Sequence, residues 1–559
     1  MTAALVPDAA PRDTAAATPT RSEGRPARPV HRWLLAAALL LGVIVRLVPV
    51  ATHDFPLNDG ALFYQMALEI RQAGFALPSV THYNADGIPF AYAPLGFYLA
   101  AVIGNSPQGI LEAVRWIPPL VACAMLPLFV LLARALLPNE RSVVAATFAF
   151  ALIPRSFLWL IMGGGLTRSL GMLFTMAALW QAHALYTRRD WRLALTTALC
   201  AALAVLSHLG TAPFLVMSMG LMWLVFGRRR HGVLSSIAVG AMVLVLTAPW
   251  WATVVAAHGL APFRAAQATG GSFLSGSDAR WVVRLTLSKL GLGTTGEPLF
   301  PLILALGIIG AIRELSWGRV LLPVWWGLIF FTDIRAPGTY ASLPIAMLAG
   351  IAASEVLLPV LRDWRPANWP APLPRALSRV TPARWSAVVL AALVGYGTFA
   401  ALLRTPSIPS ELHVLTSLDS ADRAAMTWVA RSTPRDARVL VVTGANWPND
   451  RIAEWFPVLA ARRSVATVQG SEWLPNAEYD RRYSNSETLA ACAASDVSCV
   501  EQWATQTRTS FSHLYVPKTE GANGMPGDDC CTTLMASAST DPRYRRIYDG
   551  PGAAVFERR

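Results

Sequence analysis

The chain has 559 residues, of which 54% are hydrophobic and only 14% charged, and its mean hydropathy is +0.42. This composition excludes an ordinary soluble enzyme and a disordered protein, and it indicates an integral membrane protein with some soluble mass attached. A net charge of +13 is also typical of nucleic-acid-binding proteins. Here, however, the arginines cluster between apolar segments, as membrane topology requires, so we expect no nucleic-acid partner.

Residues 1–32 are rich in Ala, Pro, Thr and Arg and have no periodic apolar pattern, so we expect a disordered tail. Residues 33–50 are long enough for a first membrane span. A cleaved signal peptide is the alternative, but the many spans that follow favour a retained helix. Arg46 is expected near the outer end of this span. There it either snorkels to the surface, which we favour, or faces a phosphate.

Ten further apolar segments bring the total to about eleven spans. Arginines cluster in alternate loops between them and in the N-terminal tail. The positive-inside rule therefore places these loops and the N-terminus in the cytoplasm, and it places the loop 53–114 and everything after residue 403 outside. The further predicted spans are 115–136, 142–161, 169–187, 192–210, 211–227, 232–257, 298–313, 318–333, 337–361 and 385–403.

The loop 53–114 is too polar to cross a bilayer and too rich in aromatic residues for a plain linker. Asn58 and Asp59 stand directly before ALFYQMALEI, whose apolar residues share one helical face. We interpret the loop as helices that lie along the membrane surface and hold a carboxylate just outside the lipid. From spacing alone, Asn58 or Asp59 is more simply read as the cap of that helix.

This loop also resembles a known family. An acidic residue soon after the first span, a surface helix and the run Tyr92–Ala101 (YAPLGFYLAA) are similar to the first external loop of GT-C glycosyltransferases. These multi-span enzymes use sugars carried on polyprenyl lipids, and they include oligosaccharyltransferase catalytic subunits, protein O-mannosyltransferases and lipid A aminoarabinose transferases. The resemblance implies that Asp59 is the catalytic carboxylate or helps to bind a metal beside it.

Other residues of the same loop are candidates by their position. Asp54 or Asp86 is placed to complete a Mg²⁺ or Mn²⁺ site with Asp59, although solvated loop acids are the plainer interpretation. We also expect Asp86, Tyr64 and Tyr92 among the substrate-binding residues.

The second external loop, IMGGGLTRSLGM, contains Gly163, Gly164 and Gly165, whose exposed amides are suited to cradle an anion. Arg168 stands on the outer side where the next span begins, whereas the arginine clusters that flank the other spans lie inside. We interpret Arg168 either as a ligand of a lipid phosphate or as half of a structural ion pair.

Three later segments add candidates. His208, near the outer end of a span, is either a packing residue or a substrate-binding residue. The external loop 258–297 has the Gly and Ser content of a mobile lid, and Glu297 at its end is a further carboxylate candidate. Arg335 follows a late span in FTDIRAPGTY, which is similar to a region of the same superfamily where a basic residue faces the catalytic cavity. A structural pair with Asp333 is the alternative.

After residue 404 the composition becomes that of a soluble α/β domain of about 150 residues. Ser420 is a candidate cap for a helix over 421–431, the runs RVLVVTG, SVATV and SHLYV predict strands, and a hairpin is expected to turn at 549–552. Adjacent cysteines rarely bond each other, so the expected partners of Cys530 and Cys531 are Cys492 and Cys499.

The run Ala425–Val442 (AMTWVARSTPRDARVLVV) resembles the opening of the external domain in oligosaccharyltransferase catalytic subunits. Those subunits next carry a Trp-Trp-Asp motif that reads the acceptor peptide, whereas this chain has TGANWPNDRIAEWF. The departure argues against a peptide-sequon acceptor. Trp447 and Trp473 are candidates for stacking on sugar rings, and Trp455 and Phe456 are expected in the core.

The sequence therefore predicts a polytopic α-helical membrane protein of GT-C type with a C-terminal extracytoplasmic α/β domain. The resemblance implies transfer of a sugar from a polyprenyl-phosphate carrier to an extracytoplasmic acceptor, which is an envelope glycan, lipid or protein. In this hypothesis Asp59 is the base, and Arg168 and Arg335 are cations on the phosphate side. A transporter or flippase-like protein for a lipid-linked sugar, and a non-catalytic relative, remain the alternatives. The predicted parts are the tail 1–32, the membrane domain 33–403 and the external domain 404–559.

Overall fold

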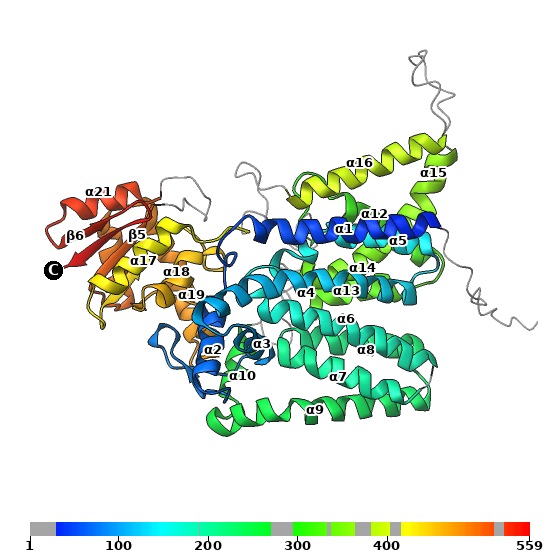
Figure 1. Cartoon of the computed structure of the whole chain (residues 1–559), viewed down its shortest axis with the longest axis horizontal. Helices are drawn as coiled ribbons and strands as arrows, with labels where there is room; N and C mark the ends of the chain where they lie inside the picture. The colour runs from blue at the N-terminus through cyan, green and yellow to red at the C-terminus, as the bar shows by residue number, and fades with distance from the viewer. Residues whose placement is uncertain are drawn as a thin grey trace, which may run out of the picture.

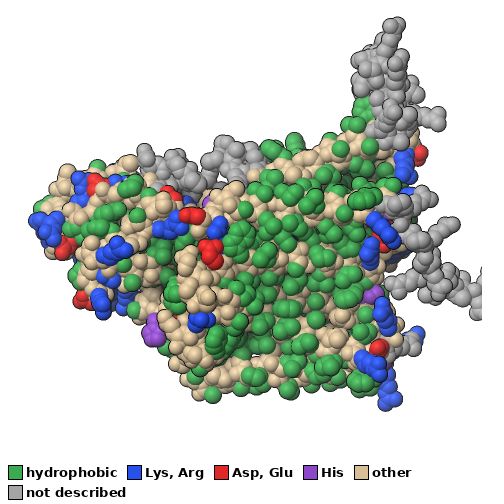
Figure 2. Space-filling view, in the orientation of Figure 1, with side chains coloured by type: hydrophobic (Ala, Val, Ile, Leu, Met, Phe, Trp, Pro, Cys, Tyr) green, Lys and Arg blue, Asp and Glu red, His purple; other side chains and the backbone are tan. Residues whose placement is uncertain are grey.

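The computed structural model describes residues 29–188, 190–269, 294–332, 337–363, 382–402, 415–518 and 530–559. Within these ranges, a bundle of long helices carries a smaller sheet-containing domain at one end (Figure 1). A broad band of hydrophobic side chains covers the bundle, and Lys and Arg side chains gather at its end away from the sheet domain (Figure 2). A helical part followed by a C-terminal sheet-containing domain agrees with the predicted fold class.

Every predicted span corresponds to helical structure in the bundle. By length and composition, five helices in the described residues are able to cross a membrane, or six if one bent pair counts as a single span. The helices of the bundle are α1 (Pro29–Ala51), α4 (Pro107–Leu136), α5 (Glu140–Leu152), α6 (Gly165–Arg188), α7 (Arg192–Ser207), α8 (Thr211–Phe226), α9 (Arg230–His258), α12 (Leu302–Ser316), α13 (Leu321–Thr332), α14 (Pro337–Ala352), α15 (Leu358–Asp363) and α16 (Pro382–Leu402).

The predicted span 142–161 is not one continuous helix. α5 ends at Leu152, Pro154 follows, and the short helical turns over 154–160 run at 82° to α5. Proline cannot donate a backbone hydrogen bond, and its ring clashes with the preceding turn, so a break at this point is expected physically. The break brings irregular backbone to the end of the bundle where the sheet domain sits.

Arg46 is fully buried beside this break, so the prediction that it snorkels to the surface is wrong. Its guanidinium donates to the carbonyls of Gly42 (3.1 Å), Phe150 (3.3 Å) and Ala151 (3.0 Å) and to the hydroxyl of Ser156 (3.0 Å). The last carbonyls of a helix have no partner within it. Arg46 supplies partners for those at the end of α5 and thereby ties α1 to the break.

The loop between α1 and α4 packs between the bundle and the sheet domain (Figure 1). The apolar face predicted for its first helix is buried, as Leu62, Met66 and Ile70 have no exposed surface. The second helix has only nine residues, which agrees with the prediction that it does not span the membrane. The loop contains α2 (Ala61–Gln72), β1 (Val80–Thr81), η1 (Tyr83–Ala85), β2 (Ile88–Pro89) and α3 (Leu95–Ile103), and α10 (Ala261–Ala268) lies beside it.

The C-terminal domain is a five-stranded mixed sheet with helices, as predicted. The strand order is β4-β3-β5-β7-β6, with β3 parallel to both of its neighbours and β7 antiparallel to both of its own. The expected hairpin joins β6 and β7. The elements are α17 (Ser420–Ser432), β3 (Arg438–Val441), α18 (Arg451–Leu459), β4 (Arg463–Ser464), α19 (Glu478–Ala490), α20 (Val497–Thr507), β5 (His513–Pro517), α21 (Thr532–Thr540), β6 (Tyr544–Asp549) and β7 (Ala553–Arg558).

Two local predictions in this domain need correction. Asp419, rather than Ser420, caps α17, and its carboxylate accepts from the amide of Asp422 (2.8 Å) in a reciprocal capping box. The disulfides join Cys492 to Cys499 and Cys530 to Cys531. The turn before α20 brings the Cα atoms of Cys492 and Cys499 to 5.5 Å, within ordinary disulfide reach, so each pair closes locally.

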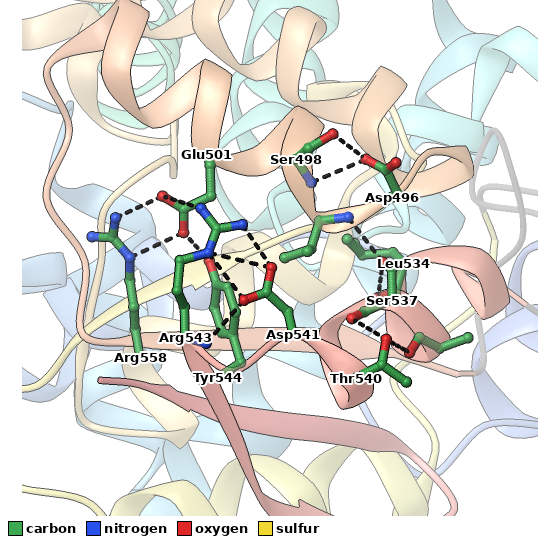
Figure 3. A network of polar contacts seen from close by, with 12 residues as sticks. Asp496, Ser498, Glu501, Leu534, Ser537, Thr540, Asp541, Arg543, Tyr544 and Arg558 are labelled. Atoms are coloured by element: carbon green, nitrogen blue, oxygen red, sulfur yellow. Dashed lines mark hydrogen bonds and ion pairs between the residues drawn. The ribbon is translucent and has the colours of Figure 1, made fainter.

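A polar network fixes α20 against the β6–β7 hairpin (Figure 3). Glu501 on α20 accepts two hydrogen bonds from Arg558 on β7, at 3.0 and 2.6 Å, and one from the hydroxyl of Tyr544 on β6. Arg543 pairs with Asp541 beside them (2.6 Å). The sheet domain is thus stabilised by contacts of its own, away from the bundle.

Close helix packing in the bundle depends on glycine. A methyl group at Gly310 of α12 would lie 2.0 Å from the carbonyl oxygen of Leu348 on α14, whereas one at Gly395 of α16 would meet no atom within 4 Å. We expect Gly310→Ala to lower the free energy of unfolding by about 1–3 kcal/mol, because overpacking forces the helices apart. Gly395→Ala, the matched control, should not lower it. Thermal unfolding in detergent micelles measures both, and equal midpoints would contradict this packing.

Candidate active site

Asp59 lies just before α2, at the end of the bundle that faces the sheet domain. Its Oδ1 accepts a hydrogen bond from the amide of Gly164 (2.7 Å), and its Oδ2 accepts one from Nη2 of Arg168 (2.8 Å). Nε of Arg168 donates to the carbonyl of Trp159 in the broken span (3.0 Å). The side chains of Asp59 and Arg168 remain 15% and 25% exposed. A carboxylate and a guanidinium are therefore held together in a fixed and partly open position.

The glycine-rich turn expected to cradle an external anion instead binds the carboxylate of Asp59. The amide of Gly163 donates to the carbonyl of Leu57 (3.0 Å), and the next amide, of Gly164, faces Asp59. A methyl group at Gly163 would lie 1.9 Å from the backbone oxygen of Asp59, and one at Gly164 would lie 2.4 Å from Oδ2. Only glycine permits this approach. α6 begins at Gly165, so the carboxylate also lies where the helix dipole favours negative charge.

The structure excludes the capping role that spacing alone suggested for Asn58 or Asp59. The N-cap of α2 is Gly60, at φ 122°, and no side chain of the loop caps the helix. Instead, Oε1 of Glu454 on α18 accepts from the amides of Gly60 (2.8 Å) and Ala61 (3.2 Å). Glu454 was not singled out from the sequence. Nothing in it brings Glu454 to a helix that starts 393 positions earlier.

Neighbouring residues of α18 bind the same loop. Nε1 of Trp455 donates to the carbonyl of Asn58 (3.1 Å), and the amide nitrogen of the Asn58 side chain donates to the carbonyl of Pro448 (3.1 Å). The hydroxyl of Tyr83 donates to the carbonyl of Glu454 (2.6 Å). Trp455 is fully buried, as predicted for a core residue. The backbone on both sides of Asp59 is thus attached to the C-terminal domain.

Burial raises the pKa of Glu454 well above its usual range, and the charge of Asp59 raises it further. The hydrogen bonds from Gly60 and Ala61 and the charge of Arg168 oppose this effect. Burial also raises the pKa of Asp450, at the start of α18, to about 6. The site therefore presents the side chain of Asp59 to Arg168, and burial favours the protonated form of Glu454 behind it.

Asp86 has a structural role that does not fit the metal-binding and substrate-binding roles predicted for it. Its side chain is 1% exposed, and its oxygens accept from Arg463 (3.1 Å), Arg482 (2.6 Å) and Asn84 (2.9 Å). The pair of Asp59 and Asp86 therefore does not fit a divalent cation. Across the described residues, no group of three or more His, Cys, Asp or Glu side chains is placed to hold one.

The aromatic residues predicted to bind substrate, Tyr64, Tyr92 and Trp473, contact one another or their neighbours between the loop and the C-terminal domain. The hydroxyl of Tyr92 donates to Glu472, and its ring packs on Trp473 at 4.6 Å between centroids. Trp473 is buried, so it does not present the exposed stacking surface that the sequence suggested. Tyr64 is half-buried, with its ring 6.3 Å from that of Trp455, and burial raises its pKa. Both tyrosines thus contact residues of the C-terminal domain.

The remaining candidates lie elsewhere or outside the described residues. His208 directly follows α7 and packs against Gly171, on the helix that carries Arg168. Glu297 is buried and accepts from the amides of Ile303 (3.0 Å) and Leu304 (3.3 Å), so it caps α12. This cap replaces the catalytic role considered for Glu297. Arg335 and Asp333, and most of the predicted lid at 258–297, lie outside the described residues.

Comparisons by sequence found no matching family model and no matching curated protein. Solved structures do match. The oligosaccharyltransferase AglB from Archaeoglobus fulgidus, in complex with an inhibitory peptide and a dolichol-phosphate, is 14% identical, with a TM-score of 0.57 over 88% of this chain and 69% of AglB. ArnT from Cupriavidus metallidurans, bound to undecaprenyl phosphate, is 14% identical, with a TM-score of 0.53 over 95% of this chain and 98% of ArnT. The chain therefore shares the overall fold of AglB and ArnT, which agrees with the predicted fold class of a polytopic helical protein with a C-terminal α/β domain.

The raised pKa of Glu454 predicts a pH dependence of stability. Above about pH 4.5 the unfolded chain releases this proton while the folded protein keeps it. The free energy of unfolding should therefore fall as pH rises, by at most about 1.4 kcal/mol per pH unit, until the pH passes the raised pKa. Glu454→Gln has no such proton. As the pH rises above about 4.5, its unfolding midpoint should rise relative to that of the natural protein. A constant difference would contradict a neutral Glu454.

Proposed function

We propose that this protein is a GT-C-type glycosyltransferase that moves a sugar from a polyprenyl-phosphate carrier to an acceptor on the outer side of the membrane. The observation that carries the proposal is the carboxylate of Asp59, bound by the amide of Gly164 and by Arg168. Two solved structures that share the fold, AglB and ArnT, hold a dolichol-phosphate and undecaprenyl phosphate, respectively. Their ligands support a lipid phosphate as the carrier.

The proposed chemistry assigns one role to each charged group. Asp59 takes the proton of the acceptor as the acceptor atom attacks the anomeric carbon of the sugar. The bond from that carbon to the phosphate oxygen breaks, and the lipid phosphate leaves with the electron pair. Arg168 stabilises the negative charge on the leaving phosphate. Nη2 and Nε of its guanidinium contact Asp59 and Trp159, and a guanidinium has five N–H donors in all, which leaves donors for a phosphate.

We propose that the remaining candidates contact the substrates. Arg335 is a second cation on the phosphate side, and His208, Tyr64 and Tyr92 contribute to binding of the lipid-linked sugar. The acceptor is an envelope glycan, lipid or protein. The run TGANWPND in place of a Trp-Trp-Asp motif argues against a peptide sequon.

We propose a bacterial cell membrane as the location, with the N-terminus in the cytoplasm and the C-terminal domain outside. The Lys and Arg side chains at the end of the bundle away from the sheet domain support this orientation (Figure 2). Membrane lipids then surround the apolar band.

Replacement of Asp59, the proposed base, tests the function directly. In membranes given labelled polyprenyl-phosphate sugars and candidate acceptors, we expect Asp59→Asn to lower transfer by about 10²–10⁴-fold, because the amide cannot accept the proton. Asp54→Asn is the matched control. Asp54 lies in the same loop, is 72% exposed and pairs with Arg423 (2.5 Å), so its removal should change transfer by less than about twofold.

Two outcomes would contradict the proposal. Transfer at the natural rate by Asp59→Asn would remove Asp59 from the mechanism. Absence of transfer from every donor, together with movement of the lipid-linked sugar across vesicles, would identify a transporter instead.

Labelling of single cysteines tests the orientation. With the free Cys123 and Cys200 changed to Ala, new cysteines replace the exposed Gln506 on α20 or Arg229 before α9. A membrane-impermeant maleimide should label Gln506→Cys in intact cells and Arg229→Cys only after permeabilisation. The reverse pattern would place the C-terminal domain in the cytoplasm.

A further inference from the structure

Two consecutive residues of α18 bind the residues on either side of Asp59. Trp455 donates to the carbonyl of Asn58 (3.1 Å), and Oε1 of Glu454 accepts from the amide of Gly60 (2.8 Å). Both belong to the C-terminal domain, and Glu454 follows Gly60 by 394 positions in the chain. A side chain is placed by its own backbone. The position of the carboxylate in the membrane domain therefore depends on a helix of another domain.

Glu454 is itself held from several directions. The carboxylate of Asp450 caps α18 by accepting from the amide of Ala453 (2.8 Å). Tyr83, from the loop, donates to the carbonyl of Glu454 (2.6 Å). The ring of the next residue, Trp455, packs edge-on against Phe55 at 4.6 Å between centroids. The backbone of Glu454 on α18 is thus fixed rather than free to follow the loop.

Burial and the charges around Glu454 favour a protonated side chain, whose Oε1 accepts from the amides of Gly60 and Ala61. Asp59 and Arg168 face it from the membrane domain, Tyr83 faces it from the loop, and Asp450 and Arg451 stand on its own helix. An ionised carboxylate at 454 would add a second negative charge behind Asp59 and would compete for Arg168. A neutral acid still offers Oε1 to the two amides and leaves Arg168 to Asp59.

We propose that Glu454 is a positioning residue for Asp59, through which the C-terminal domain sets the place of the carboxylate. The inference rests on the proposed function, in which Asp59 is the base. Glu454 acts through the backbone of residues 60–61 and touches no substrate. It makes docking of the C-terminal domain a condition for a productive site, so the two domains share one active centre.

Three substitutions at position 454 test this role by steady-state transfer kinetics. Glu454→Gln keeps an acceptor oxygen at the same reach, so its kcat should stay within about threefold of the natural value. Glu454→Ala removes the acceptor and should lower kcat by about 10–100-fold, since a displacement of about 1 Å costs this much. The KM for the lipid donor should change little. Glu454→Asp is one methylene shorter and should fall between them.

Glu501→Ala is the control for general damage to the C-terminal domain. It removes a carboxylate that binds Arg558 and Tyr544 in the network on α20, which does not include Asp59 or its partners (Figure 3). We expect it to lower the thermal midpoint while leaving kcat unchanged. Natural kcat in Glu454→Ala would overturn the inference. So would an equal loss in Glu454→Gln and Glu454→Ala at equal thermal midpoints.

Hydrogen–deuterium exchange over residues 57–64 gives a readout that needs no activity. Glu454→Ala should speed exchange of the amides of Gly60 and Ala61, and Glu454→Gln should not. If the natural protein transfers no sugar from any donor, the proposed function fails, and this exchange experiment alone decides whether Glu454 positions the loop. Unchanged exchange in Glu454→Ala would overturn the inference whether or not the protein is an enzyme.

Discussion

The close contact between the backbones at residues 59–60 and 163–164 is the constraint on which the site depends. Gly60 adopts a positive φ, and its own Cβ, if it had one, would lie 2.9 Å from Cα of Gly163. This approach carries the carboxylate of Asp59 onto the amide of Gly164. It also brings the carboxylate to the first turn of α6, from which Arg168 extends back to it. A larger side chain at these glycines would separate Asp59 from Arg168.

The break between α5 and the helical turns over 154–160 is the second feature on which the site depends. Irregular backbone in a membrane protein is tolerated only where it is buried or lines a cavity, since its polar groups need partners. Arg46 satisfies the carbonyls of Phe150 and Ala151, and Arg168 satisfies that of Trp159. Two arginines thus stabilise the break, and one of them also binds Asp59. The hydrogen bonds from these arginines offset the cost of breaking the helix.

Sequence reasoning predicted what periodicity and hydropathy encode, namely the helices, the surface loop and the α/β domain. It singled out Asp59 and Arg168 separately, but their pairing joins residues 109 positions apart, and no local pattern encodes that distance. The same limit explains the errors. Arg46 was expected to snorkel and Asp86 to bind substrate or a metal, because their partners, Ala151 and Arg482, come from distant segments.

The C-terminal domain is better understood as part of the site than as an appended module. Glu454 binds the start of α2, Arg482 binds Asp86, and Glu472 accepts from Tyr92, so three separate segments of the domain hold one loop of the membrane domain. The bundle supplies Gly164 and Arg168 to the carboxylate of Asp59, while the C-terminal domain fixes the loop that carries it. The pair of Asp59 and Arg168 therefore depends on both parts of the chain.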